Sequence, residues 1–237
     1  MEEGICMTIT NPEENTEVLI TEIENNAWDL PRIDEDSQYL KMKRVIDVIG
    51  AIVGLILLSP IFLLVYVLIK IEEGNQPVIF KQKRVGLNGE EFYMYKFRSM
   101  VCNAEELKLQ LLTRNEATGP VFKIKLDPRI TRVGKFIRKT SIDELPQLYN
   151  VLKGEMSLVG PRPPLPEEVE QYSLHDWRRL SVVPGLTCYW QVAGRSNIRF
   201  EKWVELDLKY INERNTWIDI KLIFKTFFLL FGCRDAY

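Results

Sequence analysis

The longest apolar run in the chain covers residues 45–71, with Asp47 and Lys70 as its only charged positions. As one continuous helix it would measure roughly 40 Å, against a bilayer hydrocarbon core of about 30 Å. Ser59 and Pro60 stand near its centre, where proline breaks the helical hydrogen-bond ladder and the serine hydroxyl can satisfy a freed carbonyl. The pattern predicts a membrane segment with a helix break at Ser59-Pro60.

Basic residues flank this segment on both sides, including Lys43 and Arg44 before it and Lys81 after it. Because positive charge marks the cytoplasmic end of a span, flanks of the same sign indicate no preferred side. We therefore expect a re-entrant membrane helix over residues 41–72 with both ends cytoplasmic; a tilted, kinked span is the alternative. Arg44 and Asp47 lie three residues apart and can form an ion pair at its start, which would offset the cost of placing Asp47 near lipid.

Shorter patterns predict an α+β fold that is mostly helical. Two segments, 78–86 and 92–100, surround the turn signal Asn88-Gly89 and are expected to be short strands, as are residues 188–192. Residues 120–138 show no regular pattern. Helical periodicity predicts helices at residues 101–115, 144–153, 167–179, 200–214 and 217–231.

The last of these helices, residues 217–231, is too short to span a bilayer but is rich in aromatic side chains. Lys221 and Lys225 lie on one side of it, one turn apart. This combination is typical of an amphipathic helix that lies in the membrane interface, and a buried C-terminal core helix is the alternative.

Charge is distributed unevenly along the chain. The net charge is −2, yet residues 1–40 carry eleven acidic side chains and one basic, which leaves 30 basic against 22 acidic in residues 41–237. We expect residues 1–40 to form an acidic, disordered tail. The basic remainder, with residues 73–237 as the catalytic domain, suits anionic partners such as nucleotides or phospholipid headgroups.

Histidine and cysteine chemistry is not indicated. The one histidine, His175, lies in a charged stretch typical of a protein surface. Four scattered cysteines without C-x-x-C spacing indicate neither a zinc site nor a disulfide framework. Acid–base chemistry is therefore expected from carboxylates, lysines or tyrosines.

Residues 144–153 are predicted to form a short amphipathic helix that ends at Gly154. Its start allows two interpretations, a capping box from Ser141 to Glu144 or Asp143 as the N-cap. We favour Asp143, because Pro146 then falls in the first turn, where its missing N–H costs no hydrogen bond. The helix dipole would then keep the Asp143 carboxylate ionised at pH 7. The residues expected to face the core are Leu145, Leu148, Tyr149 and Leu152.

The Asp143-Glu144 pair stands between cationic groups. Arg138 lies one turn upstream, and Arg162 follows between prolines that fix the backbone and lower the entropic cost of holding a guanidinium. A helix cap that complements the dipole is the alternative explanation for the two acids. Carboxylates beside guanidinium groups make a site for phosphate and Mg²⁺, and a carboxylate can also attack phosphorus as a nucleophile.

Several short motifs are spread over residues 43–231. They are KRxxD at 43–47, Ser59-Pro60, YKFRSM at 95–100, residues 141–148, residues 150–154, GPRP at 160–163, PGLT at 184–187, QV at 191–192, GR at 194–195 and Asp207. Together they resemble the bacterial sugar transferase family, the monotopic polyprenyl-phosphate phosphoglycosyl transferases, in its small catalytic-domain form. Cys188 and Tyr189 depart from the resemblance, because the family commonly has glycine and an apolar residue there.

The resemblance implies a two-step reaction. A nucleotide diphosphate sugar, usually a UDP-sugar, binds with Mg²⁺, and Asp143 attacks the sugar-bearing phosphorus so that UMP leaves. The aspartyl enzyme then passes the phosphosugar to undecaprenyl phosphate, which begins the synthesis of exopolysaccharide, capsule, lipopolysaccharide or another glycoconjugate. The resemblance also implies Glu144, together with Asp143, as Mg²⁺ ligands and Arg138 and Arg162 as phosphate-binding residues, with Arg98 and Asp207 as further candidates.

The same resemblance implies a location at the cytoplasmic face of the bacterial inner membrane, with the bilayer as a partner and a homodimer left open. Nucleic acid is not expected, because only residues 92–100 combine aromatic and basic side chains in a strand. A non-catalytic, membrane-tethered adaptor with a basic surface is the alternative, and it would give no reason for Arg162 to lie between prolines.

Overall fold

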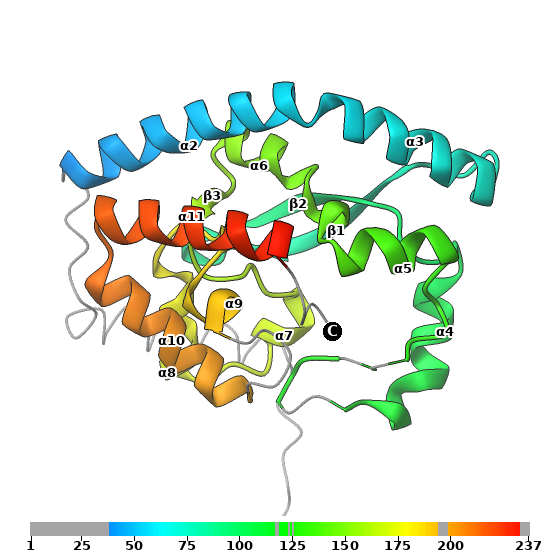
Figure 1. Ribbon diagram of the computed structural model, residues 1–237. Coiled ribbons are helices and arrows are strands. Elements are labelled where there is room, and N and C mark those ends of the chain that lie inside the picture. Colours follow the sequence, from blue (N-terminus) through cyan, green and yellow to red (C-terminus); the bar gives the residue numbers. More distant parts are fainter. Residues whose placement is uncertain (1–37, 117–118, 123, 125, 194–198, 233–237) are drawn as a thin grey trace, which may run out of the picture.

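The computed structural model describes residues 38–116, 119–122, 124, 126–193 and 199–232 (Figure 1). The predicted acidic tail lies outside the described residues except for its last three, which begin the first described helix. The α-helices are α2 (Gln38–Leu57), α3 (Ser59–Glu73), α4 (Ala104–Leu111), α5 (Arg132–Lys139), α6 (Gln147–Lys153), α7 (Pro166–Val169), α8 (Leu174–Trp177), α9 (Tyr189–Ala193), α10 (Phe200–Glu213) and α11 (Thr216–Gly232).

Short 3-10 helices and strands connect these elements. The 3-10 helices are η2 (Leu87–Gly89), η3 (Leu112–Arg114), η4 (Ile142–Glu144) and η5 (Arg178–Ser181), and the strands are β1 (Ile79–Val85), β2 (Glu91–Phe97), β3 (Ser157–Val159) and β4 (Gly185–Thr187). β1 and β2 form an antiparallel hairpin, whereas β3 and β4 pair in parallel. The predicted hairpin is confirmed, and Asn88 and Gly89 both adopt the positive φ angles that its turn requires.

The helix break predicted at Ser59-Pro60 is present. α2 and α3 meet at Leu58 and are bent by 58°. The Ser59 hydroxyl donates to the Ile56 carbonyl at 2.8 Å, the carbonyl that a residue with an N–H at position 60 would have bonded. Among the described helices none alone has the length and apolar composition to cross a bilayer, and only α2 and α3 taken as one bent pair meet those criteria.

α2 and α3 run along one side of the molecule, and α5, α6 and α11 pack against them (Figure 1). Arg44 of α2 donates to the carbonyls of Val151 and Leu152 at the end of α6, at 2.6 and 2.7 Å. Asp47 accepts from the Leu158 N–H of β3 at 2.8 Å. The predicted Arg44–Asp47 ion pair is therefore wrong, because each group bonds instead to backbone groups that its neighbouring element leaves unsatisfied.

A buried cluster fixes the C-terminal helix α11 to α2. Lys43 Nζ lies 2.9 Å from Asp219 Oδ2, and the Tyr210 hydroxyl donates to Asp219 Oδ1 at 2.7 Å. On the same helix Leu222 is buried, whereas Trp217 is 80% exposed. The predicted helix is confirmed. One side of α11 packs in the core, as the core-helix interpretation requires, and the other side is exposed, as the interfacial-helix interpretation requires.

Two segments differ from their predicted structure. α5 begins inside residues 120–138, which were expected to be irregular. Two acceptors cap its N-terminus: Thr131 Oγ1 accepts from Gly134 N, and the distant Glu72 accepts from Arg132 N. Residues 188–192 are not a strand but belong largely to α9, whose Trp190 ring stacks on Trp203 at 4.6 Å. A short apolar run is consistent with either structure, and tertiary packing decides between them.

Of the remaining predicted helices, some form as single helices and others are divided into shorter ones. α10 is confirmed, and α4 with η3 covers most of the helix expected at 101–115. The single helix predicted over 167–179 is wrong, because the chain forms α7, α8 and η5 there. Ser173 makes a new N-cap by accepting from the Asp176 N–H, which restarts the helix.

Candidate functional site

Asp143 and Glu144 lie in η4, between α5 and α6. Ser141 turns the chain sharply, with a left-handed φ of 55° that a serine adopts at some cost. Pro146 forms the N-cap of α6, and no side chain caps η4. Both interpretations of this start are therefore wrong: Asp143 is not an N-cap and no capping box forms, because the chain makes two short helical segments here instead of one.

α6 holds this turn against the core. Leu148 is buried as expected, and Leu145 and Leu152 are half-buried, but Tyr149 is 52% exposed, which corrects the expectation that it faces the core. The buried Val151 was not among the residues expected there. The Tyr149 ring packs edge-on against Tyr95 of β2, with 5.6 Å between the ring centroids. The buried Asn150 side chain also bonds to β2, donating to the Tyr93 carbonyl at 2.7 Å and accepting from the Tyr95 N–H at 3.1 Å. Gly154 ends α6 with a φ of 88°, as predicted.

The Asp143 carboxyl group is buried and lies close to a second acid. Burial first, and the neighbouring Glu144 carboxylate second, raise its pKa to about 6, while Lys96 and Arg138 oppose the shift. The expectation of an ionised carboxylate at pH 7 agrees with this value. The environment differs from the one predicted, however, because burial raises the pKa where a helix N-cap would have lowered it.

Glu144 and Arg162 line one cavity of about 80 Å³. Lys96 Nζ lies 2.8 Å from Glu144 Oε1 and reaches the same cavity from β2. Backbone hydrogen bonds on both sides fix the Pro-Arg-Pro segment, since Gly185 N donates to the Pro161 carbonyl and Val85 N to the Pro164 carbonyl. The remaining lining residues are Arg84, Met94, Gln147, Pro163, Gly185, Leu186, Trp190 and Gln191.

The cavity has the charge of an anion-binding site. Arg84, Lys96 and Arg162 line it, against one carboxylate, that of Glu144. Guanidinium and ammonium groups are the usual ligands of phosphate oxygens. Of the acidic pair Glu144 lines the cavity, whereas the buried Asp143 is not among the lining residues. A phosphate bound here would therefore lie next to the Asp143-Glu144 turn.

The acidic pair also fits one particular kind of magnesium site. Within the described ranges no cluster of three or more His, Cys, Asp or Glu side chains is arranged to hold a metal. Mg²⁺ is commonly bound by one or two carboxylates together with waters and substrate phosphates. Asp143 and Glu144 therefore suit an ion shared with a phosphate substrate. Burial first and the Glu144 charge second raise the pKa of Asp143, and a cation would offset the second of these effects.

Residues 38–233 match the family model described as bacterial sugar transferase. The chain belongs to the bacterial sugar transferase family. This membership confirms the resemblance read from the motifs.

The family relatives include a galactosyl transferase CpsE from Streptococcus agalactiae serotype III (strain NEM316), 52% identical over 79% of this chain and 42% of its own length. An undecaprenyl-phosphate galactose phosphotransferase from Salmonella typhimurium (strain LT2) is 43% identical over 89% of this chain and 43% of its own length. The chain thus spans less than half of these two proteins. The exopolysaccharide production protein ExoY from Rhizobium meliloti (strain 1021) is 39% identical over 78% of this chain and 83% of its own length.

The other residues that the sequence suggested for the site, Arg138, Arg98 and Asp207, lie in three different places. Arg138 on α5 is close enough to act on the pKa of Asp143. Arg98 follows β2 and donates to the Pro77 carbonyl at 2.6 Å, away from the cavity lining. Asp207 is fully buried on α10 in an ion pair with Arg179, with Oδ2 2.7 Å from Nη2, so it also lies outside the lining.

Arg84 and Lys96 were not singled out as site residues from the sequence. Both stand on the hairpin among several other basic side chains, such as Lys81 and Lys83, that point to solvent. The alternation of side chains along a strand could have indicated them, because it puts Arg84 and its neighbour Lys83 on opposite faces of the hairpin. The face that carries Arg84 is the one that lies toward the Asp143-Glu144 turn.

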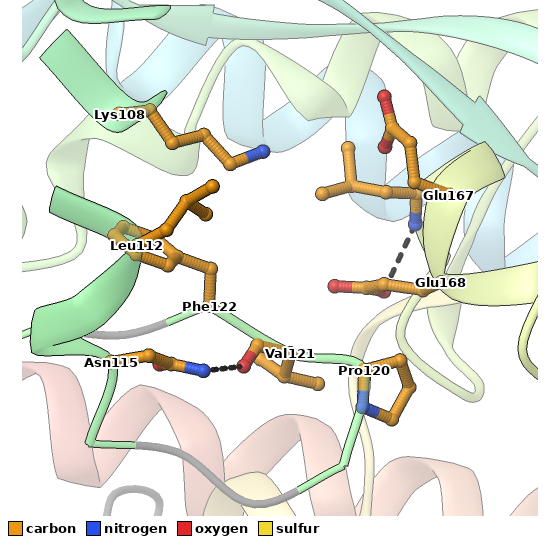
Figure 2. Close-up of a pocket in the computed structure, with 9 residues that line it drawn as sticks. Lys108, Leu112, Asn115, Pro120, Val121, Phe122, Glu167 and Glu168 are labelled. Atoms are coloured by element: carbon orange, nitrogen blue, oxygen red, sulfur yellow. Dashed lines mark hydrogen bonds between the residues drawn. The ribbon is translucent and has the colours of Figure 1, made fainter. Parts of the chain in front are cut away.

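A second cavity, of about 180 Å³, lies apart from the acidic pair (Figure 2). Figure 2 shows Lys108 and Glu167 on opposite sides of it, with Phe122 and Val121 below. Glu168 also lines this cavity and lies 3.8 Å from Arg162. The Glu168 side chain therefore lines the second cavity and also pairs with Arg162, which lines the first.

Proposed function

We propose that this chain transfers a sugar 1-phosphate from a UDP-sugar to undecaprenyl phosphate through a covalent aspartyl intermediate. The observation that carries the proposal is the buried Asp143 carboxyl group next to Glu144, which itself lines a cavity together with Arg84, Lys96 and Arg162. Relatives named as undecaprenyl-phosphate galactose phosphotransferase and as UDP-glucose:undecaprenyl-phosphate glucose-1-phosphate transferase support the two substrates. Such a reaction would begin the synthesis of a polysaccharide or another glycoconjugate.

In the first step a carboxylate oxygen of Asp143 forms a bond to the sugar-bearing phosphorus, and the bond from that phosphorus to the bridging oxygen breaks. The electron pair leaves with UMP. In the second step a phosphate oxygen of undecaprenyl phosphate attacks the same phosphorus and returns the carboxylate of Asp143. The lipid product carries a diphosphate-linked sugar, and no oxidant or reductant is needed.

The protein's part in these steps is to position the groups and to neutralise charge. In this proposal Arg162 and Lys96, which both line the cavity, hold phosphate oxygens, and Arg138 favours the ionised form of Asp143. Glu144 holds Lys96 in place through their ion pair and is the proposed Mg²⁺ ligand together with Asp143. Mg²⁺, when bound, would supply further neutralisation of the diphosphate charge.

A re-entrant membrane position agrees with the exposed side chains. α2 and α3 present an open apolar face, as does the outer side of α11, where lipid would replace water. Both substrates could then meet, because the lipid phosphate remains at the interface while the nucleotide arrives from the cytoplasm. The exposed residues include Ile49, Ile52, Val53, Ile56, Leu57, Leu63, Leu64, Val67, Ile71, Trp217, Phe224, Phe227 and Phe228.

Cysteine labelling tests this topology. Lys41→Cys adds one thiol in the first turn of α2, and Asn75→Cys adds one after α3; both positions are exposed. In inverted and right-side-out vesicles, a membrane-impermeant maleimide is expected to label both from the cytoplasmic side only. Labelling of the two positions from opposite sides would show a span instead, and the parent chain gives the background from its native cysteines.

The raised pKa of Asp143 predicts a titration that can be followed without metal or substrate. With a pKa of about 6, the carboxyl group is largely protonated below pH 6 and largely ionised above it. In Lys96→Met the midpoint should move upward by roughly one pH unit, because the cation that favours the ionised form is gone. The measurement is the ¹³C carboxyl signal of labelled aspartate that is absent from Asp143→Asn, and a midpoint near 4 would contradict the prediction.

The reaction itself is tested with purified protein, Mg²⁺, undecaprenyl phosphate and a panel of UDP-sugars. We expect UMP release and a lipid-linked sugar diphosphate from one donor or a few closely related donors. If no nucleotide sugar yields UMP, the transferase proposal fails and the adaptor alternative takes its place.

A further inference from the structure

Arg84 is a buried guanidinium that the protein satisfies only in part. It lies on β1 with 5% of its surface exposed and lines the cavity next to the acidic pair. Nη1 donates to the Pro163 carbonyl at 3.0 Å and Nη2 to Gln82 Oε1 at 2.7 Å. Nε has no hydrogen-bond partner.

No carboxylate of the described residues forms an ion pair with Arg84. Buried guanidinium groups normally have such a partner, because removing the charge from water is costly. Burial first, and the like charge of Arg162 second, lower the pKa of Arg84 to about 9 against the opposing effect of Glu168, which still leaves Arg84 protonated at pH 7. Glu168 pairs with Arg162 at 3.8 Å but forms no ion pair with Arg84.

The cavity has room and further donors for an anion. Its volume of about 80 Å³ is several times the roughly 15 Å³ that one water molecule requires. Trp190 of α9 also lines the cavity and has an indole N–H with no hydrogen-bond partner. Such unsatisfied donors around a positively charged cavity are explained if a negatively charged group completes them.

We propose that Arg84 binds the donor's diphosphate directly and forms, with Arg162, a two-arginine subsite. This inference rests on the proposed function for the identity of the anion. Arg84 also holds the Pro163 carbonyl, so it both contacts the ligand and orients the neighbouring Arg162. A rigid fork that donates to backbone and ligand at once is a role that arginine fills and lysine does not.

The test uses the full chain in nanodiscs and measures binding of inorganic pyrophosphate and of UDP by calorimetry. Arg84→Gln is expected to weaken both about tenfold to a hundredfold, the effect of losing hydrogen bonds to a charged group. Lys83→Gln is the matched control: it removes the same charge from the same strand at an exposed position, where Lys83 pairs with Glu91, and should change binding less than about twofold.

A second comparison separates ligand contact from positioning. If Arg84 acted only by orienting Arg162, Arg84→Gln would have no effect in an Arg162→Gln background. We expect a further loss of pyrophosphate affinity of at least about fivefold there. Unchanged affinity in that background would overturn the proposal, as would absence of pyrophosphate binding by the wild type.

Arg84→Lys is the variant that tests binding in a protein expected to remain folded. It keeps the charge, and its melting temperature should remain close to that of the wild type. Its pyrophosphate affinity is expected to fall severalfold because the fork is lost, and wild-type affinity in this variant would contradict the proposal. Pyrophosphate binding could depend on Arg84 while the protein transfers no sugar phosphate. That result would support the anion subsite and reject only the proposed function.

Discussion

Asp143→Asn is expected to lower sugar-phosphate transfer by about a thousandfold or more, because the amide cannot form the acyl phosphate on which both proposed steps depend. Asparagine has nearly the same shape as aspartate, so the buried turn should remain folded. The measurement is the rate of UMP release with the preferred donor. Mass spectrometry of the wild type incubated with that donor, without lipid acceptor, should find the phosphosugar on the peptide that contains Asp143.

Glu170→Gln is the control for this variant, since Glu170 is an exposed carboxylate outside the cavity lining. Its transfer rate should equal that of the wild type. Two results would contradict the proposed mechanism: an Asp143→Asn protein with more than about a tenth of the wild-type rate, or a phosphosugar attached to another residue. Either would mean that the carboxylate acts by some means other than nucleophilic attack.

Asp207→Asn is expected to destabilise the folded protein by about 3–5 kcal/mol, because it leaves the buried Arg179 charge without its partner. The two side chains are 0% and 3% exposed, and Arg179 Nε donates to Asp207 Oδ2 at 2.8 Å. Arg179 also donates to the Tyr172 hydroxyl at 2.7 Å, which cannot neutralise it. The measurement is the free energy of unfolding in urea, followed by circular dichroism in mild detergent.

The same helix provides the control. Glu205 pairs with Lys202 on the exposed side of α10, with both side chains more than half exposed. Glu205→Gln should cost no more than about 1 kcal/mol, since solvent screens such pairs. Equal losses for the two variants would contradict the assignment of Asp207 to a buried structural pair. UDP binding by the folded Asp207→Asn protein should remain close to that of the wild type, since Asp207 lies outside the cavity lining.

Local patterns were sufficient where one segment carried its own structural information. The hairpin followed from two strand-like segments around Asn88-Gly89, and the end of α6 from Gly154, whose φ of 88° favours glycine. The break at Ser59-Pro60 followed from the missing proline N–H. In each case the residues that determine the structure are neighbours in the chain, so the sequence shows them directly.

The predictions that failed depended on contacts between distant segments. α5 begins where Glu72, 60 residues away, accepts its free N–H group. Arg44 and Asp47 were expected to pair because they are one turn apart, yet each found a backbone partner in α6 or β3. Residues 188–192 became a helix because Trp190 stacks on Trp203.

By itself the sequence determined the acidic pair, the Pro-Arg-Pro segment, the broken apolar helix and, through its motifs, the family. Only the tertiary structure decided which cations share a cavity with Glu144. It brought Arg84 and Lys96 there from the hairpin, placed Arg98 outside the lining and buried Asp207 against Arg179. The physical reason is that charge and periodicity are local properties, whereas burial and the distance between charged groups depend on how segments far apart in the chain pack together.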